Sequence, residues 1–376
     1  MAESDVRVEE DFEVVLRVLP RGWQEKAKEL GALRRRRHID SPEVLLRLLL
    51  IHLAEGCSLR ETAAIARRSK LAHVSDVALM ERLRMSGRWF QWMNQELMAS
   101  WAMPQPNWVY GNQWNVRLVD GSCIKEPGPT GSSWRIHYSI RLPSLACEEL
   151  SISSHKGPGE SFKRFTVHAG DLFIGDRAYG VAPGIAHVVS QGGEVLARFA
   201  MSNLPLSAPE GGSFALLEHL RTLRGARIGD WPAMVSNGGW RMAGRVCAVR
   251  KSRQAAENAR KQVFRQAHKK GGTIKDETLE AAEYVYVFTT LPEAALSPSN
   301  VLEVYRGRWQ IELVFKRLKS ILGLGHLRKI DPDSAKAWLH GKLFVAFLVE
   351  TLLRYAESFF PWGYPLSEQD NSLPLA

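Results

Sequence analysis

The chain has 376 residues, a formal net charge of +10 and a pI near 9.5. Hydrophobic residues make up 45% and charged residues 24%, which is typical of a soluble globular protein and excludes a largely disordered chain. The length predicts two or three domains, and the basic excess favours an anionic partner, nucleic acid first and a membrane surface second.

Neither the start of the chain nor its apolar runs indicate export or membrane insertion. The first eleven residues are acidic and lack the apolar stretch of a secretory signal. The apolar runs at 44–54 and 343–353 are interrupted by polar or charged residues and are too short to cross a bilayer, so they predict buried helices. Four cysteines without a CxxC pair argue against a zinc module and fit a reducing compartment.

The first hundred residues predict helices in a basic setting. Ser58-Leu-Arg-Glu61 is a capping box that opens a short helix. After a break, Ser75 or Asp76 caps a second helix that runs towards Leu97. Helix, short break, helix resembles a helix-turn-helix, although any helical bundle contains such pairs.

The middle of the chain predicts an α/β sheet. Short segments rich in β-branched and aromatic residues alternate with one helical segment. Strands are predicted at 116–120, 134–140, 149–153, 172–176 and 195–199, and a helix at 181–190. From residue 203 the chain becomes rich in Gly, Pro and turns, and this part ends in a clear strand at 284–290.

A strongly basic stretch lies inside that second part. Residues 241–275 carry eleven basic residues against a single acidic one, and 252–270 lack Gly and Pro and predict a helix. A solvated helix face is the ordinary interpretation of a charge run, but ion pairs four residues apart cannot neutralise so one-sided a set. We expect Arg260, Lys261 and Arg265 to contact DNA phosphates.

The strongest pattern lies in the helix predicted at 299–322, which Ser299 would cap and which a last helix at 334–355 follows. On a wheel of about 100° per residue, one polar stripe lies apart from the apolar face. The stripe contains Tyr305, Arg308, Glu312 and Lys319. A surface stripe with an ion pair between Arg308 and Glu312 is the alternative.

The spacing Tyr-x2-Arg-x3-Glu-x6-Lys of these four residues resembles the signature of IS4-type DDE transposases. Two other blocks are similar to family blocks: RLVDGS, where Asp120 matches the first catalytic aspartate, and IGDRAYG, where Asp176 matches the second. The order Asp, Asp, Glu and the long insert before the Glu also match, and the resemblance covers about residues 40–355. It implies that Asp120, Asp176 and Glu312 form a catalytic, metal-binding triad.

The resemblance further implies Mg²⁺ as cofactor, with two ions and with Mn²⁺ as a substitute. Two Mg²⁺ ions roughly 3.5–4 Å apart can activate the attacking oxygen and stabilise the leaving one at phosphorus. Carboxylate oxygens are the ligands that Mg²⁺ prefers. The residues themselves leave two alternatives open, a hairpin turn at Asp120-Gly121 and an Asp176 that pairs only with Arg177.

The same resemblance suggests roles in DNA contact. Arg308 and Lys319 would hold phosphates beside the scissile bond, and Tyr305 would contact a phosphate too. Tyr284 stands where many relatives have tryptophan and would stack an extruded base, with packing in the core as the alternative.

The implied fold is an α/β RNase H-like core, a mixed sheet flanked by helices, interrupted by a β-rich insertion. The expected division is 1–105 as a helical DNA-binding region, 106–202 as the first part of the core, 203–291 as the basic insertion, 292–357 as the second part of the core and 358–376 as a tail.

The implied function is cut-and-paste DNA transposition. The protein would cleave terminal inverted repeats and transfer the strands into target DNA, as a homodimer at the nucleoid of a prokaryotic cytoplasm, without a membrane partner. Two alternatives compete with it: a sequence-specific DNA-binding protein with a decayed or repurposed core, and a metal-dependent nuclease that does not join strands.

Overall fold

The computed structural model of the chain describes residues 12–34, 38–101, 113–125, 133–154, 157, 159–320, 322–325, 327 and 331–359. They belong to two compact units. The helical unit comprises residues 1–103, 123–134 and 315–376, and the sheet unit comprises residues 104–122 and 135–314.

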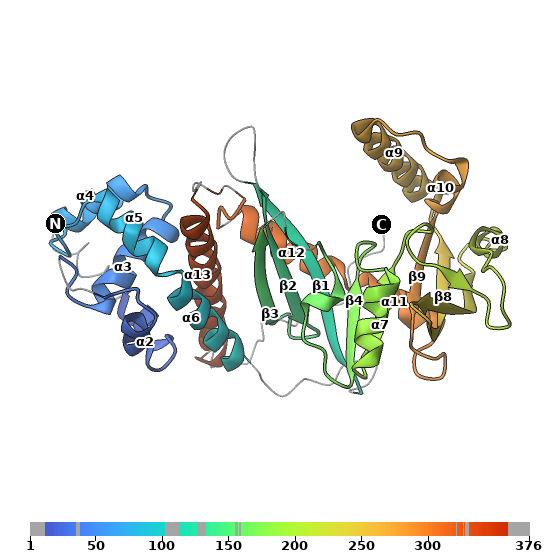
Figure 1. Ribbon diagram of the computed structural model, residues 1–376, viewed down its shortest axis with the longest axis horizontal. Coiled ribbons are helices and arrows are strands. Elements are labelled where there is room, and N and C mark those ends of the chain that lie inside the picture. Colours follow the sequence, from blue (N-terminus) through green and yellow to red (C-terminus); the bar gives the residue numbers. More distant parts are fainter. Residues whose placement is uncertain are drawn as a thin grey trace. The chain divides into compact units, whose positions relative to one another are not determined.

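The helical unit is built around two helices that lie side by side, α6 and the long α13 (Figure 1). The rings of Trp89, Phe90 and Phe344 pack in its core, with centroids 5.8 and 5.4 Å apart. Within the described part of the chain, every helix is too short or too polar to span a bilayer. The helices are α2 (Trp23–Glu29), α3 (Pro42–Leu53), α4 (Leu59–Arg68), α5 (Asp76–Met85), α6 (Gly87–Ser100) and α13 (Pro332–Phe359).

The predicted capping box is confirmed at the start of α4. The Ser58 hydroxyl accepts a hydrogen bond from the Glu61 amide at 3.2 Å, and the Glu61 carboxylate accepts one from the Ser58 amide at 2.7 Å. The prediction of one helix from Ser75 towards Leu97 is wrong, because α5 ends at Met85 and α6 begins at Gly87.

Glycine stands where this second helix is divided. A Cβ atom on Gly87 would lie 3.2 Å from the Cβ of Ala337, so the first residue of α6 approaches α13 closely. The Ser86 hydroxyl donates to the Arg82 carbonyl at 2.7 Å and closes the last turn of α5.

The sheet unit contains one mixed sheet of nine strands in the order β3-β2-β1-β4-β5-β9-β8-β7-β6. The central strands β1, β4 and β5 are parallel. The pairs β5–β9, β9–β8, β8–β7 and β7–β6 are antiparallel. The strands are β1 (Asn115–Lys125), β2 (Ser133–Arg141), β3 (Cys147–Ser154), β4 (Asp171–Gly175), β5 (Glu194–Arg198), β6 (Leu206–Ser207), β7 (Ile228–Asn237), β8 (Trp240–Arg250) and β9 (Tyr284–Thr289).

Helices accompany this sheet, and the predicted mixed α/β architecture is confirmed (Figure 1). The basic helix appears as expected and is capped by Ser252. The helices are the single 3-10 turn η1 (Phe162–Arg164), α7 (Ala182–Ser190), α8 (Leu216–Arg221), α9 (Arg253–Lys270), α10 (Asp276–Ala281), α11 (Pro298–Arg306) and α12 (Trp309–Ser320), whose second half belongs to the helical unit.

The strands of the predicted insertion do not form a sheet of their own. Strand β9 pairs with β5 on one side and with β8 on the other, so β6 to β9 continue the sheet that contains β1 and β4. The five-part division of the chain given above remains a prediction.

A buried arginine fixes the strand that leads to the candidate site. Arg117 on β1 is 1% exposed and forms ion pairs with Glu148 at 3.4 Å, Glu149 at 2.8 Å and Asp171 at 3.2 Å. These carboxylates come from β3 and β4, so one side chain ties three strands together. A buried arginine with this many partners also holds β1 in register.

The prediction of one helix over 299–322 is wrong. Helix α11 is capped by Ser297, ends at Arg306, and is followed by α12 from Trp309. Between them the hydrogen bonds span three residues, from the Arg308 amide to the Tyr305 carbonyl at 3.0 Å and from the Gln310 amide to the Gly307 carbonyl at 3.1 Å. Gly307 is a poor helix former and occupies this break, so the stripe drawn across it is not one helix face.

Candidate active site

Asp120 and Asp176 reach the same edge of the sheet because their strands are parallel neighbours. Leu118 on β1 pairs with Ile174 on β4. Asp120 lies two residues after Leu118, and Asp176 lies two residues after Ile174. The alternative of a hairpin turn at Asp120-Gly121 is wrong, since β1 continues to Lys125. Asp176 directly follows β4 and accepts a hydrogen bond from the Ala178 amide at 2.8 Å.

Glu160 is a third carboxylate at this edge. Asp120, Glu160 and Asp176 can each offer one oxygen so that all three lie within 4.8 Å of one another. Glu160 stands just before η1, where the buried ring of Phe162 anchors the chain against Tyr179 with centroids 5.1 Å apart. We refer to these three residues as the carboxylate cluster.

Gly121 makes room for Glu160. A Cβ atom at position 121 would lie 2.6 Å from the Cγ and 2.7 Å from the Oε1 of Glu160, which is closer than van der Waals contact allows. Any larger residue would therefore displace the Glu160 carboxylate from Asp120. Gly121 therefore packs against a neighbouring carboxylate within β1 and does not form a turn with Asp120.

The cluster is electrostatically strained. Burial, followed by repulsion from Asp176 and Glu160, raises the pKa of Asp120 to about 7, against the lowering effects of the Gly121 amide and Arg308. Burial and Asp176 also raise the pKa of Glu160, although Arg135 at 3.4 Å opposes the shift. Gathering carboxylates in this way is costly unless a cation joins them.

Tyr179 places a polar group beside the three acids. Its ring is fully buried, and among the described residues its hydroxyl has no hydrogen-bond partner. Burial raises the pKa of Tyr179, and the charges of Asp120, Glu160 and Asp176 raise it further. Three carboxylate oxygens within 4.8 Å of one another fit a hard divalent cation such as Mg²⁺.

Glu312 lies outside the carboxylate cluster. Its side chain is 57% exposed and forms an ion pair with Arg308, four residues earlier. The Arg308 guanidinium is 18% exposed and approaches Asp120 at 4.0 Å. The structure therefore brings Asp120 and Asp176 together directly. Among the described residues, Arg308 lies between Glu312 and Asp120, and the ion pair of the surface-stripe alternative is present.

Tyr305 and Lys319, the other two residues of the signature, differ in environment. Tyr305 is 8% exposed and lies beside Arg308, whose guanidinium is 6.0 Å from the ring centroid. Burial raises the pKa of Tyr305. Lys319 lies half-buried near the end of α12, in the helical unit.

The tyrosine predicted to stack a base is part of the core in this structure. Tyr284 is 3% exposed and packs in the apolar cluster of the sheet unit, with the Arg250 guanidinium 5.9 Å from its ring. This is the arrangement expected from the core-packing alternative, and stacking on a base would require the ring to become exposed.

The basic helix α9 follows β8 directly in the chain (Figure 1). Lys261 and Arg265 are exposed on it, whereas Arg260 forms an ion pair with Glu283, which also pairs with Arg250 at 3.1 Å. A cavity of about 450 Å³ opens at this point, lined by Arg250, Lys251, Arg253, Ala256, Glu257, Arg260 and Glu283.

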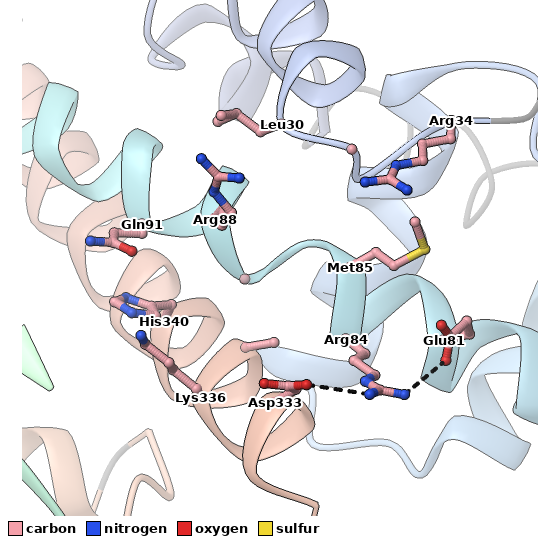
Figure 2. A pocket seen from close by; sticks show the side chains of 13 residues that line it. Leu30, Arg34, Glu81, Arg84, Met85, Arg88, Gln91, Asp333, Lys336 and His340 are labelled. Atoms are coloured by element: carbon pink, nitrogen blue, oxygen red, sulfur yellow. Dashed lines mark hydrogen bonds and ion pairs between the residues drawn. The ribbon is translucent and has the colours of Figure 1, made fainter. Parts of the chain in front are cut away.

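The helical unit contains a basic cavity of about 360 Å³ (Figure 2). Arg84 is neutralised at its edge by ion pairs with Asp333 at 3.3 Å and Glu81 at 3.8 Å. The lining residues are Leu30, Gly31, Arg34, Glu81, Arg84, Met85, Gly87, Arg88, Gln91, Asp333, Lys336, Ala337 and His340.

Three further cations give this cavity its positive charge. Arg34 and Arg88 extend toward the same open space, and Lys336 lies beside His340 (Figure 2). Burial and Lys336 lower the pKa of His340 to about 4, so the ring is neutral at pH 7. Among the described residues its Nδ1 atom has no hydrogen-bond partner.

Comparison with known proteins identifies the family. The family model for the transposase DDE domain matches residues 159–348. The chain is 34% identical over 348 residues to InsL, the transposase assigned to insertion sequence element IS186A of Escherichia coli K12, which covers 91% of this chain and 93% of InsL.

It is also 34% identical over 349 residues to the transposase for insertion sequence element IS421 of Escherichia coli, with the same coverage. The chain belongs to the IS4 family of DDE transposases. The transposase is therefore an enzyme that acts on DNA, and its family uses a divalent metal.

A shorter similarity connects the transposase to an element of Bacillus thuringiensis. It is 37% identical over 75 residues to the transposase for insertion sequence element IS231F of Bacillus thuringiensis subsp. israelensis, which is 20% of this chain and 16% of that relative.

Sequence reasoning missed Glu160 and Tyr179. Neither residue has a fixed spacing to Asp120, and Glu160 lies in a bend that no periodicity predicts. In the sequence, Tyr179 is the aromatic residue of the IGDRAYG block that contains Asp176. A relation between its hydroxyl and Asp120 becomes apparent only once β1 and β4 are known to be neighbouring strands.

Proposed function

We propose that the transposase cleaves DNA at terminal inverted repeats and joins the freed ends to target DNA, with Asp120, Asp176 and Glu312 as its catalytic triad. The observation that supports this most is the register of β1 and β4, which places Asp120 and Asp176 at one sheet edge. The metal would be Mg²⁺, with Mn²⁺ as a substitute.

The bound cation supplies activation of the attacking oxygen and stabilisation of the leaving oxygen at phosphorus. The carboxylates would hold the cation and fix its place relative to the sheet. Arg308 contributes a planar guanidinium that can grip two phosphate oxygens beside Asp120. A DNA phosphate that binds Arg308 competes with Glu312 for the guanidinium and leaves the Glu312 carboxylate available to the site.

Two basic surfaces, one in each unit, would hold the DNA. Lys261 and Arg265 on α9 are exposed and suited to backbone phosphates. Arg34 and Arg88 in the cavity of the helical unit offer guanidinium groups for another phosphate. Phosphate contacts of this kind fix the position of DNA without reading its sequence.

The assembled enzyme would be a homodimer, because the two ends of an element are joined in one event. The relatives are bacterial, so we also propose that the transposase works in the cytoplasm of a prokaryote at the nucleoid.

The experiment is an incubation of labelled inverted-repeat DNA and target DNA with the protein and Mg²⁺, analysed on denaturing and native gels. We expect cleaved and joined products from the wild type. The variants Asp176→Asn and Glu312→Gln should still shift the DNA but give neither product. A shift without cleavage by the wild type would support the decayed core, and cleavage without joining would support the nuclease.

A further inference from the structure

We propose that Glu160 is a metal ligand of the transposase, and that Asp120, Glu160 and Asp176 bind a divalent cation before DNA arrives. This inference rests on the proposed function for the role of Asp120 and Asp176. It differs from that proposal in assigning to Glu160, rather than to Glu312, the third carboxylate of the DNA-free site.

The geometry of the three carboxylates carries the first step. Their oxygens lie within 4.8 Å of one another, a separation that a single cation can bridge. Among the described residues, Arg135 lies 3.4 Å from Glu160 and Arg308 lies 4.0 Å from Asp120. Arg308 is also paired with Glu312.

The buried hydroxyl of Tyr179 is the second observation. Among the described residues this fully buried hydroxyl has no hydrogen-bond partner, and an unsatisfied buried hydroxyl costs free energy. A hydrated cation between the carboxylates would provide the oxygen atom that this hydroxyl lacks, since Mg²⁺ and Mn²⁺ retain water ligands in protein sites.

Gly121 is the third observation. Because this residue of β1 has no side chain, the strand leaves room for the Glu160 carboxylate beside it. A single methyl group at position 121 would overlap the Cγ and Oε1 atoms of Glu160. A structural role of Glu160 as a partner of Arg135 alone does not require this approach to Asp120.

The state of Glu312 completes the argument. Its carboxylate is paired with Arg308 and more than half exposed, while Glu160 is 21% exposed. Removing Glu312 should therefore leave metal binding by the DNA-free protein unchanged, although it abolishes cleavage. Removing Glu160 should weaken metal binding itself.

The test is titration of the DNA-free, full-length protein with Mn²⁺ at pH 8, followed by calorimetry and by the electron paramagnetic resonance signal of free Mn²⁺. We expect Glu160→Gln to weaken binding at least tenfold, as Asp176→Asn does. Glu312→Gln and Glu303→Gln, the second a control at an exposed glutamate of α11, should bind within twofold of the wild type.

Gly121→Ala provides a variant that keeps every charge. It should displace the Glu160 carboxylate and weaken Mn²⁺ binding at least fivefold, and it serves if Glu160→Gln does not fold. Wild-type affinity in both Glu160→Gln and Gly121→Ala, together with loss of binding in Asp176→Asn, would overturn the role of Glu160 and leave the proposed function standing. Wild-type affinity in Asp176→Asn as well would overturn both.

Discussion

Replacing Asp120 by asparagine should stabilise the metal-free transposase at pH 8. The pKa of Asp120 is raised from 3.8 to about 7, chiefly by burial and then by its acidic neighbours. Between these two values the folded protein binds a proton that the unfolded chain has released, so stability falls as pH rises through the window from about 4 to 7. Asparagine carries no charge and avoids this loss.

The size of the effect follows from the shift. About three pKa units correspond to ~4 kcal/mol at 1.36 kcal/mol per unit. Because the Asp120 side chain retains 16% exposure and some hydration, we expect a gain of about 2–4 kcal/mol at pH 8 and almost none at pH 4. The asparagine side-chain oxygen can still accept the 2.8 Å hydrogen bond from the Gly121 amide.

Urea denaturation in the presence of a chelator, at pH 8 and at pH 4, measures this difference. Asp171→Asn is a matched control at a buried aspartate of the same sheet, and it should destabilise the protein because it removes a partner of Arg117. If Asp120→Asn were no more stable than the wild type at pH 8, the carboxylate cluster would not be strained in solution.

Three further predictions concern the replacement of arginine and lysine side chains. Arg308→Lys should slow cleavage nearly as much as Arg308→Gln, because lysine keeps the charge but loses the planar fork, and wild-type turnover in the lysine variant would refute the two-oxygen grip. Replacing Lys261 and Arg265 by glutamine should lower the log–log salt slope of DNA affinity by about 2, at ~0.9 per phosphate, and an unchanged slope would mean that both face only solvent. Arg117→Met should lower the free energy of unfolding by about 3–5 kcal/mol in urea, since three acids lose this ion-pair partner, and a loss below about 1 kcal/mol would contradict its role in tying the strands.

The sequence predicted the elements that depend on local pattern. The strands of the core are rich in β-branched and aromatic residues and α9 lacks Gly and Pro, so these elements could be predicted. Asp176 was correctly placed after its strand, whereas Asp120 lies inside β1, which continues to Lys125. The family signature located Arg308 and Glu312 for the same reason, since their separation of four residues is local.

The rest depended on contacts between distant segments. Whether β9 joins the core sheet or a separate one is decided by its pairing with β5, which no local pattern records. The wheel over 299–322 assumed a continuous helix, and the break at Gly307 appears only with the hydrogen bonds around it. Glu160 reaches Asp120 only because Gly121 has no side chain, and the sequence shows the glycine without its neighbour.

The order of pairing in the sheet has a consequence for how the enzyme is made. Strand β5 pairs with β4 soon after both are synthesised, but its other neighbour, β9, follows about ninety residues later. Such non-local pairing forms slowly, and chains fold from the N-terminus as they are synthesised. Asp120, Glu160 and Asp176 are thus all synthesised before β9 and before Glu312. With the roles proposed above, a chain released early would carry the three proposed metal ligands without the glutamate proposed for cleavage.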